Sequence, residues 1–209
     1  MLEKISLGGA QLGFHYGINN EYGKLTKKEI LEILHFSYNK GIQKIDTASR
    51  YGDSEKFLGE YFKENPENRF KVTTKFNLKN KSLEESLFSS LKLLNLKKID
   101  TILFHSYDDY LLNKNNLNLF TSLNKFKYFE KIGVSIYTND ELKSCLEDEN
   151  IDVIQTPFNL LDNDSKKGKL LKKAKKLDKE IQVRSVFLQG LFFRPDSFFD
   201  NHFVEIGSK

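Results

Sequence analysis

The sequence predicts an α/β fold of the (β/α)8 TIM-barrel type, incomplete, with about seven β/α units in its 209 residues. Short runs of apolar and β-branched residues alternate with longer amphipathic stretches along the whole chain. This alternation indicates a parallel sheet with right-handed helical crossovers. The glycines of LGGAQLG, residues 7–13, do not form the GxGxxG turn of a doubly wound nucleotide-binding sheet. The barrel is therefore the better of the two architectures.

Each strand is predicted from one short apolar run, and the helices from start signals and periodicity. The predicted strands are 4–7, 43–47, 71–76, 99–104, 131–136, 153–156 and 181–187. Three helices are predicted to begin at capping boxes, in which a hydroxyl and a carboxylate satisfy each other's backbone donors. These boxes are Thr26 with Glu29, Ser82 with Glu85 and Thr138 with Glu141. Leucines 83, 87, 91 and 94 form one stripe on the second of these helices, and Gly41 is a predicted helix C-cap.

Composition limits the function classes. Hydrophobic residues make up 39% and charged residues 30%, which excludes a disordered chain and predicts one domain over residues 1–209. The 33 basic and 29 acidic residues nearly balance, so we expect no nucleic-acid partner. The lysines of 166–179 are interpreted as a solvated helix face in preference to a phosphate-binding stripe.

The remaining compositional signals concern compartment and metal. No apolar run approaches the roughly 20 residues that span a bilayer, and no signal peptide follows Met1, so a cytoplasmic protein with no membrane partner is expected. Cys145 is the single cysteine, which excludes an intramolecular disulfide framework and a cysteine zinc cluster. The histidines have no metal-ligand spacing, so no metal site is predicted.

Ionisable residues appear at the carboxyl ends of three successive predicted strands. Asp46 ends the second strand, Lys75 the third and His105 the fourth, and Tyr51 lies in the loop after Asp46. Each residue alone has an ordinary explanation as a cap, a solvated charge or a bystander. In a barrel, however, the carboxyl ends of the strands surround one pocket, so the joint occurrence indicates a catalytic site.

The most specific stretch around these residues is GIQKIDTASRYGDSEKFLG, residues 41–59. Further motifs are VTTKF (72–76), TILFHS (101–106), GVSIY (133–137), IQTPFNLLD (154–162) and VRSVFLQGLF (183–192). In content and order these motifs resemble the aldo/keto reductase superfamily over nearly the whole chain. The resemblance implies an NADPH- or NADH-dependent oxidoreductase that reduces an aldehyde or ketone to an alcohol. It also implies that Asp46, Tyr51, Lys75 and His105 form the catalytic tetrad.

Elementary chemistry supports these implied roles. Carbonyl reduction requires a proton for the oxygen, and a phenol with a reference pKa of about 10 is a reluctant donor at neutral pH. We expect Lys75 to lower the pKa of Tyr51, the general acid, while Asp46 holds Lys75 and keeps it charged. His105 is expected to be neutral and to orient the substrate carbonyl.

The resemblance also implies a nicotinamide site. Ser135 and Gln155 match positions that hold the carboxamide, and Arg184 stands where an aromatic side chain often stacks on the ring. With Ser185 they are the predicted cofactor-binding residues. Ile136 replaces an asparagine that is common at its position in the family.

The chain is shorter than the roughly 250 residues of a typical barrel, and we expect its last strand and helices to be missing. In the family that segment binds the adenosine phosphate, so its loss implies weak NADPH binding and a truncated chain. The first and seventh strands would present open edges, through which self-association is expected.

Two alternatives remain open. One is a catalytically impaired remnant, or a non-catalytic binding or regulatory barrel. The other is an aldolase that forms a Schiff base on Lys75. A nucleophilic lysine should be neutral, so the adjacent Asp46 and Tyr51 are less natural for that mechanism. The substrate is expected to be a small carbonyl compound. A sugar-related one is suggested because LGGAQLGFHYGINN, residues 7–20, resembles short reductases associated with surface polysaccharide synthesis.

Overall fold

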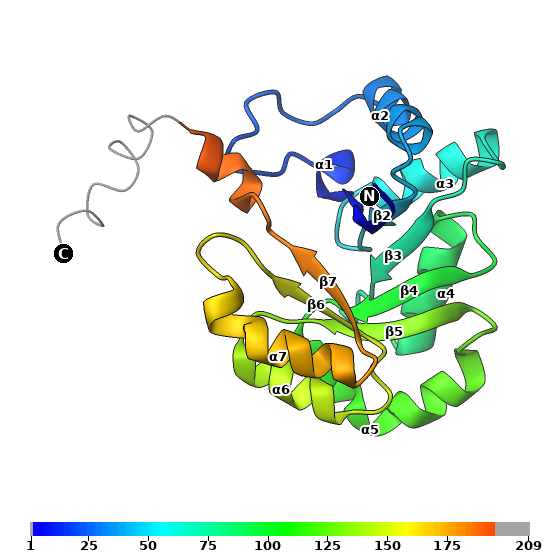
Figure 1. The fold of residues 1–209 in the computed structure, drawn as a ribbon. Helices are drawn as coiled ribbons and strands as arrows, with labels where there is room; N and C mark the ends of the chain where they lie inside the picture. The colour runs from blue at the N-terminus through cyan, green and yellow to red at the C-terminus, as the bar shows by residue number, and fades with distance from the viewer. Residues whose placement is uncertain (1, 195–209) are drawn as a thin grey trace.

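The computed structural model describes residues 2–194, in which seven parallel strands form one curled sheet (Figure 1). The strands are β1 (Leu7–Gly8), β2 (Lys44–Asp46), β3 (Lys71–Lys75), β4 (Ile99–Phe104), β5 (Phe129–Ser135), β6 (Val153–Pro157) and β7 (Glu180–Arg184). Each strand pairs in parallel with the next one along the chain. This sequential order confirms the predicted incomplete barrel, because a doubly wound sheet reverses its strand order.

Helices connect the strands and lie on the outer face of the curled sheet (Figure 1). They are α1 (Ala10–Gly13), α2 (Lys27–Asn39), α3 (Ser54–Glu64), α4 (Leu83–Leu93), α5 (Tyr107–Asn124), α6 (Asn139–Glu147) and α7 (Asp164–Lys176), with 3-10 helices η1 (Leu2–Lys4) and η2 (Leu188–Phe193). The three predicted capping boxes are confirmed at α2, α4 and α6. Gly41, with φ +88°, follows the C-cap of α2.

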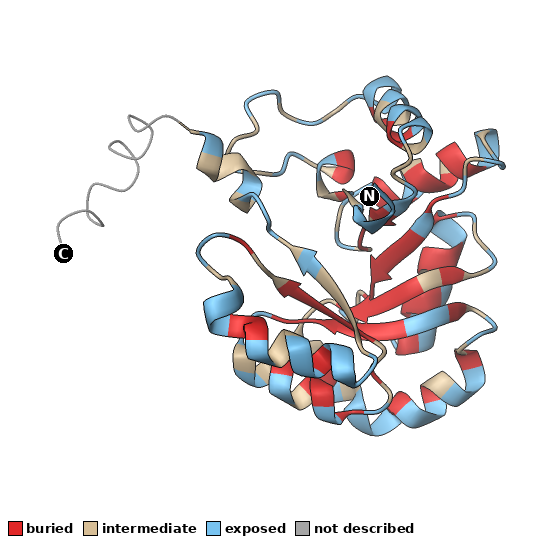
Figure 2. Cartoon of the chain, viewed as in Figure 1, coloured by how far each residue is buried: buried red, intermediate tan, exposed pale blue. Residues whose placement is uncertain are grey.

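The core lies between the middle strands and the helices that cover them (Figure 2). The predicted leucine stripe of α4 is buried, which anchors that helix to the sheet. Beside it, the Phe76 ring lies 5.1 Å from that of Phe104 and 5.8 Å from that of Phe120. Burial of such rings is the main favourable term in folding, so β3 and β4 belong to the most firmly packed part of the molecule.

Two predicted strand boundaries are wrong by three residues, and the others lie within two residues of the observed ones. The strand predicted at 4–7 is reduced to Leu7–Gly8, because residues 2–4 form the exposed turn η1, which the hydrogen bond from Ile5 N to Leu2 O closes. The strand predicted at 181–187 ends at Arg184, since Ser185 has a φ of +58°, which a strand residue does not adopt. In the described sheet, β1 and β7 each pair with a single strand. The expectation that no eighth strand follows residue 194 lies outside the described residues.

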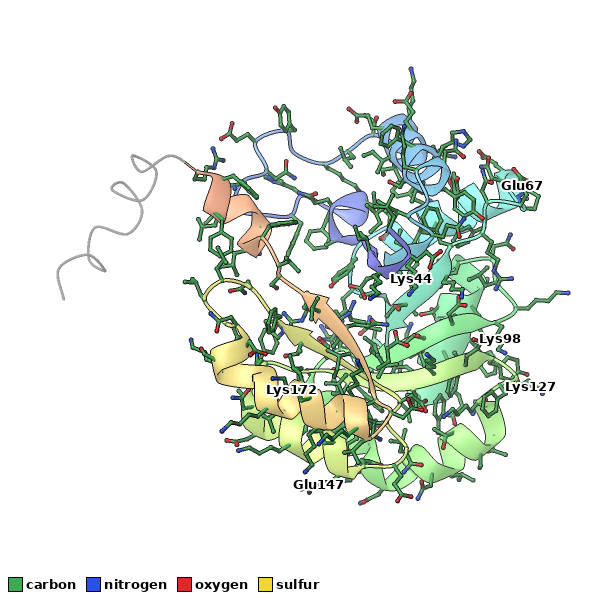
Figure 3. All side chains as sticks on the ribbon, viewed as in Figure 1. Lys44, Glu67, Lys98, Lys127, Glu147 and Lys172 are labelled. Atoms are coloured by element: carbon green, nitrogen blue, oxygen red, sulfur yellow. The ribbon has the colours of Figure 1, made fainter. Side chains whose placement is uncertain are left out.

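The lysines of 166–179 largely follow the predicted solvated face. Lys172 lies on the exposed face of α7 (Figure 3), where Ala174 faces the core. Lys167 is the exception, because it is only 2% exposed and its ammonium pairs with Asp162. Within residues 2–194, no helix combines the length and the apolarity needed to cross a membrane.

Candidate active site

The charge pair at the carboxyl ends of β2 and β3 is the centre of the site. Lys75 is 1% exposed, and its Nζ donates to Asp46 Oδ1 at 2.8 Å and Oδ2 at 2.9 Å. The third acceptor is the carbonyl oxygen of Thr47 at 2.9 Å. Burial lowers the pKa of Lys75, and the charge of Asp46 opposes that effect. The expectation that Asp46 holds Lys75 is therefore confirmed.

Tyr51 is carried to this pair by the loop between β2 and α3. The loop is held against α1 by close backbone contact: a Cβ at Gly13 would lie 1.5 Å from the Tyr51 carbonyl oxygen. Only glycine fits there. The Tyr51 ring centroid lies 5.0 Å from Lys75 Nζ, and the His105 ring stands edge-on to it at 5.8 Å. The structure thus brings all four predicted tetrad residues together.

The expectation of a lowered pKa for Tyr51 is wrong for this arrangement, because the net effect of the surroundings is to raise it. Burial raises the pKa of the phenol above its ordinary value, and the negative charge of Asp46 raises it further. Lys75 does not offset this rise through a hydrogen bond, since its three acceptors match its three N–H donors and its cation faces the Tyr51 ring. Tyr51 therefore keeps its proton firmly at neutral pH.

His105 follows β4 and is neutral, as predicted. Burial lowers its pKa to about 4, and the positive charges of Lys75 and Arg50 contribute. Its Nδ1 is buried without a hydrogen-bond partner among the described residues. A neutral imidazole at this place can accept or donate one hydrogen bond without adding charge to the site.

Ser135 and Gln155 are neighbours across β5 and β6, and both are buried. Gln155 Nε2 donates to Asp46 Oδ1 at 3.0 Å, a contact that the sequence did not predict. Gln155 Oε1 is buried without a partner in the part of the chain that the structure describes. A free acceptor beside a buried hydroxyl suits the N–H donors of a carboxamide, so these residues fit the nicotinamide end of the implied cofactor.

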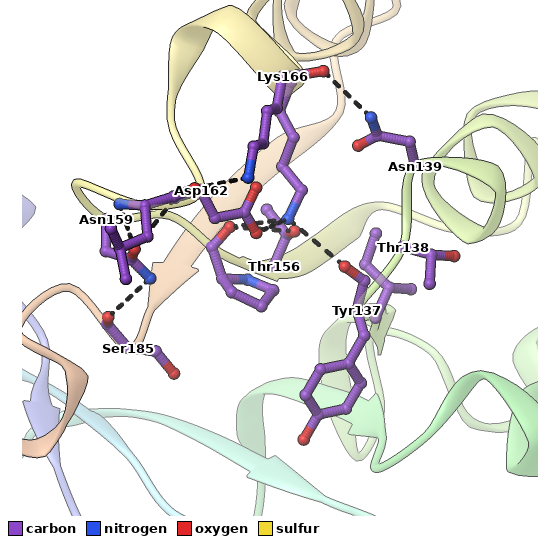
Figure 4. Close-up of polar contacts among 12 residues, drawn as sticks. Tyr137, Thr138, Asn139, Thr156, Asn159, Asp162, Lys166 and Ser185 are labelled. Carbon is purple, nitrogen blue, oxygen red and sulfur yellow. Dashed lines mark hydrogen bonds and ion pairs between the residues drawn. The ribbon is translucent and has the colours of Figure 1, made fainter. Parts of the chain in front are cut away.

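The structure places Arg184 and Ser185 at the end of β7. The Arg184 guanidinium lies 4.2 Å over the centroid of the Tyr137 ring, and its Nη2 donates to the Ile136 carbonyl at 3.0 Å. Ser185 is exposed, and its carbonyl accepts from Asn159 Nδ2 at 3.3 Å (Figure 4). The Arg184 side chain thus packs against the end of β5, and Ser185 contacts Asn159 through its carbonyl and Arg184 Nη1 through its Oγ at 3.5 Å.

Sequence reasoning missed three further features of the site. The Thr47 carbonyl is a backbone acceptor, which no side-chain pattern reveals. Gln182 reaches across the barrel, with Nε2 3.4 Å from Thr73 Oγ1. Lys167, hidden in a run of lysines, pairs with Asp162 and donates to the Pro157 carbonyl at 3.1 Å, which braces the loop after β6.

Together these groups can supply a proton to an oxygen atom and stabilise charge that develops there. Tyr51 provides the O–H, Lys75 a buried cation, and His105 a neutral hydrogen-bonding group. All three stand at the carboxyl ends of parallel strands or in the loop that follows, where barrel enzymes place their active sites.

Comparison with known proteins agrees with this geometry. The model of the aldo/keto reductase family matches residues 4–202. An aldo-keto reductase of Bacillus halodurans superposes with a TM-score of 0.72 at 20% identity, over 92% of this chain and 65% of that one. A glycerol dehydrogenase of Gluconobacter oxydans gives a TM-score of 0.72 at 21% identity, over 96% and 67%.

A curated relative matches part of the chain in sequence. An aryl-alcohol dehydrogenase of Pestalotiopsis microspora is 30% identical over 123 residues, which are 50% of this chain and 32% of that protein. The chain therefore matches about a third of the length of this relative. The family match covers nearly the whole chain and includes every residue of the site described above, and the chain belongs to the aldo/keto reductase family.

Proposed function

We propose that this site reduces an aldehyde or ketone to an alcohol, with NADPH or NADH as the hydride donor and Tyr51 as the general acid. The observation that carries the proposal is the convergence of Asp46, Lys75 and His105 around Tyr51 in a chain of this family. A structural neighbour from Bombyx mori, with a TM-score of 0.65 and 21% identity, is described in complex with NADP, which supports a nicotinamide cofactor.

The nicotinamide nucleotide would supply the hydride when bound. In this chain, Ser135 and the free Gln155 Oε1 would hold its carboxamide end. Tyr51 donates its phenolic proton to the carbonyl oxygen of the substrate, and His105 hydrogen-bonds to the same oxygen and fixes its direction. These two groups act on one atom, which their edge-on ring packing allows.

Lys75 and Asp46 act through Tyr51. A raised pKa keeps the phenol protonated until the oxygen of the substrate becomes basic during the reaction. Once the proton has left, the phenolate is stabilised by the Lys75 cation 5.0 Å from the ring. Asp46 fixes that cation with two hydrogen bonds, so the site needs little rearrangement during the reaction.

The experiment is the substitution Tyr51→Phe, assayed for turnover of aldehydes and for NADPH binding. We expect turnover to fall about 10²-fold or more, the scale of lost general acid catalysis, with NADPH affinity unchanged within about twofold. Tyr107→Phe is the matched control, since it removes a hydroxyl that bonds to Ser144 outside the site. Normal turnover in Tyr51→Phe would remove this residue from the mechanism.

Turnover of the unsubstituted chain and borohydride trapping separate the reductase from the two alternatives. A catalytically impaired or regulatory barrel shows no turnover in the unsubstituted chain, whatever the carbonyl substrate. A Schiff-base aldolase would instead form an adduct on Lys75 that borohydride traps. The double contact of Lys75 with Asp46 favours the charged lysine and hence the reductase.

A further inference from the structure

Arg184 stands apart from the other cations near the site because its charge has no acidic partner in the part of the chain that the structure describes. Lys75 pairs with Asp46, and Arg50 lies 3.5 Å from Asp109. Among residues 2–194, no carboxylate lies within ion-pair distance of the Arg184 guanidinium. Partly buried arginines are seldom left in this state, since a desolvated charge is stabilised chiefly by an opposite one.

The strand places this charge on the inner face of the barrel. Gln182 points inward, because its amide reaches Thr73 Oγ1 on β3 and Gln155 on β6. Side chains two residues apart on a strand share a face, so Arg184 lies on the same face, one layer nearer the carboxyl end. Its positive charge acts on both Tyr51 and Lys75, lowering the pKa of each. Arg184 therefore borders the space above the tetrad.

The orientation of the guanidinium leaves donors free. Stacking on Tyr137 holds its plane, Nη2 donates to Ile136 O, and Nη1 lies 3.5 Å from Ser185 Oγ. Arginine has five N–H donors, and these contacts use two of them. A fixed fork with unused donors is the group that recognises carboxylates and phosphates, often with two parallel bonds.

We propose that Arg184 binds an anionic group, a carboxylate or a phosphate, on the molecule that occupies the tetrad site. The inference rests on the proposed function only in placing that molecule. Two sources carry this chemistry: a carbonyl substrate with an acidic group, such as a sugar acid, and the phosphate of the nicotinamide nucleotide. The anion pairs with the positive charge of Arg184 and holds the ligand against the strand ends.

Calorimetric titration with two matched ligand pairs distinguishes the sources. Glucuronate and glucose differ by one carboxylate, whereas nicotinamide mononucleotide and nicotinamide riboside differ by one phosphate. We expect Arg184→Gln to weaken binding of the anion-bearing member of one pair by about 10-fold or more, and to leave glucose and nicotinamide riboside, which lack the anionic group, within about twofold. Arg184→Lys keeps the charge but loses the fork, so its effect should be intermediate.

The control is Arg69→Gln, which removes the same charge from a residue that bonds to the Lys98 carbonyl and should change neither pair. Circular dichroism establishes that each variant is folded. The inference is overturned if the unsubstituted chain binds neither anion-bearing ligand more tightly than the partner that lacks the anion, or if Arg184→Gln weakens all four ligands equally. Because no turnover is measured, failure of the Tyr51 mechanism would leave this result unaffected.

Discussion

The two sides of the site are built from strands of very different burial. Every residue of β4 except Asp100 is buried, and on β3 only Lys71 is exposed. On β7 no residue is buried, and Val183 is 50% exposed (Figure 2). A strand at the end of the sheet has one hydrogen-bonded neighbour, whereas β3 and β4 have two.

The polar contacts follow the same division. Lys75 on β3 makes three hydrogen bonds of 2.8 to 2.9 Å, whereas Gln182 on β7 lies 3.4 Å from Thr73 and 3.5 Å from Gln155. Proton transfer requires fixed geometry, which the packed strands provide. Arg184, which we propose to bind the anionic group of the ligand, stands on the more exposed strand. The difference suggests that chemistry and selectivity are divided between the two sides.

The largest expected effect tests the packing difference directly. Phe76→Ala removes a fully buried ring at the carboxyl end of β3 and should lower the free energy of unfolding by about 3–5 kcal/mol. Val183→Ala on β7 removes half-exposed methyl groups and should cost less than about 1 kcal/mol. Urea denaturation measures both values. Equal losses of unfolding free energy in the two variants would show that β7 is packed as firmly as β3, which would contradict the difference between the two strands.

The next effect concerns charge. Asp46→Asn keeps the shape of the side chain but leaves the Lys75 ammonium buried without its counter-charge, so we expect a loss of about 3 kcal/mol at pH 7. Glu180→Gln breaks the ion pair with Lys131 on the β7 side, where both side chains are more than a third exposed. That change should cost less than about 1 kcal/mol.

The pH dependence of Asp46→Asn identifies the cause of its instability. Burial already lowers the pKa of Lys75, and loss of Asp46 lowers it further. Between the folded pKa and the unfolded pKa of 10.5, the unfolded chain binds more protons, so stability rises with pH. The deficit of the variant should therefore shrink toward pH 10. A deficit that is constant with pH would point to lost packing instead.

Local signals explain what the sequence could predict. The capping boxes at Thr26, Ser82 and Thr138 involve residues three apart, so their chemistry is complete within one helical turn. The strand-end positions of Asp46, Lys75 and His105 follow from the alternation of strands and helices, which places all carboxyl ends at one edge. Fold and clustering of these three residues were therefore within reach of pattern reasoning, whereas their assignment with Tyr51 as a catalytic tetrad came from the family resemblance.

Long-range packing explains what the sequence could not predict. The hydrogen bond between Gln155 and Asp46 joins residues 109 positions apart, and it depends on how closely the barrel brings β6 to β2. The raised pKa of Tyr51 depends on burial and on the side of Lys75 that faces the ring. Neither property has a signature in the neighbouring residues, because each is set by the curvature of the whole sheet.

The third prediction concerns His105, on the packed side. Its pKa of about 4 lies below the ordinary 6.5, so between these pH values the unfolded chain binds a proton at His105 that the folded chain does not bind. Stability contributed by the neutral ring is present above pH 6.5 and is lost as pH falls through 4. The difference between these two pKa values limits the stability lost on acidification to about 3 kcal/mol, and residual solvent access reduces the expected loss to about 2 kcal/mol.

Proton NMR titration measures this pKa directly, since the imidazole signals of His105 should remain unshifted between pH 8 and 5.5. His105→Gln cannot titrate, so its stability should fall less than that of the unsubstituted chain between pH 6.5 and 4. A His105 resonance that titrates near 6.5 would show that the pocket is open to water, and that the two sides of the site differ less than their burial indicates.

The smallest expected effect on the folded chain concerns the free edge of β7, through which we propose that the chain self-associates. Glu180 N and Arg184 O bond toward β6, so the backbone groups of Ile181 and Val183 point to the other edge, which no strand within residues 2–194 pairs. Val183→Lys should change the free energy of unfolding by less than about 0.5 kcal/mol, because the side chain is half exposed, yet it places a charge where a second strand would pair.

Sedimentation over a concentration series should show association of the unsubstituted chain that weakens about 10-fold in Val183→Lys. It should not weaken in Phe36→Lys, which adds the same charge to an exposed site on α2. If the unsubstituted chain is monomeric throughout, or if both variants associate alike, the edge of β7 is not an interface, and its exposure serves the ligand site alone.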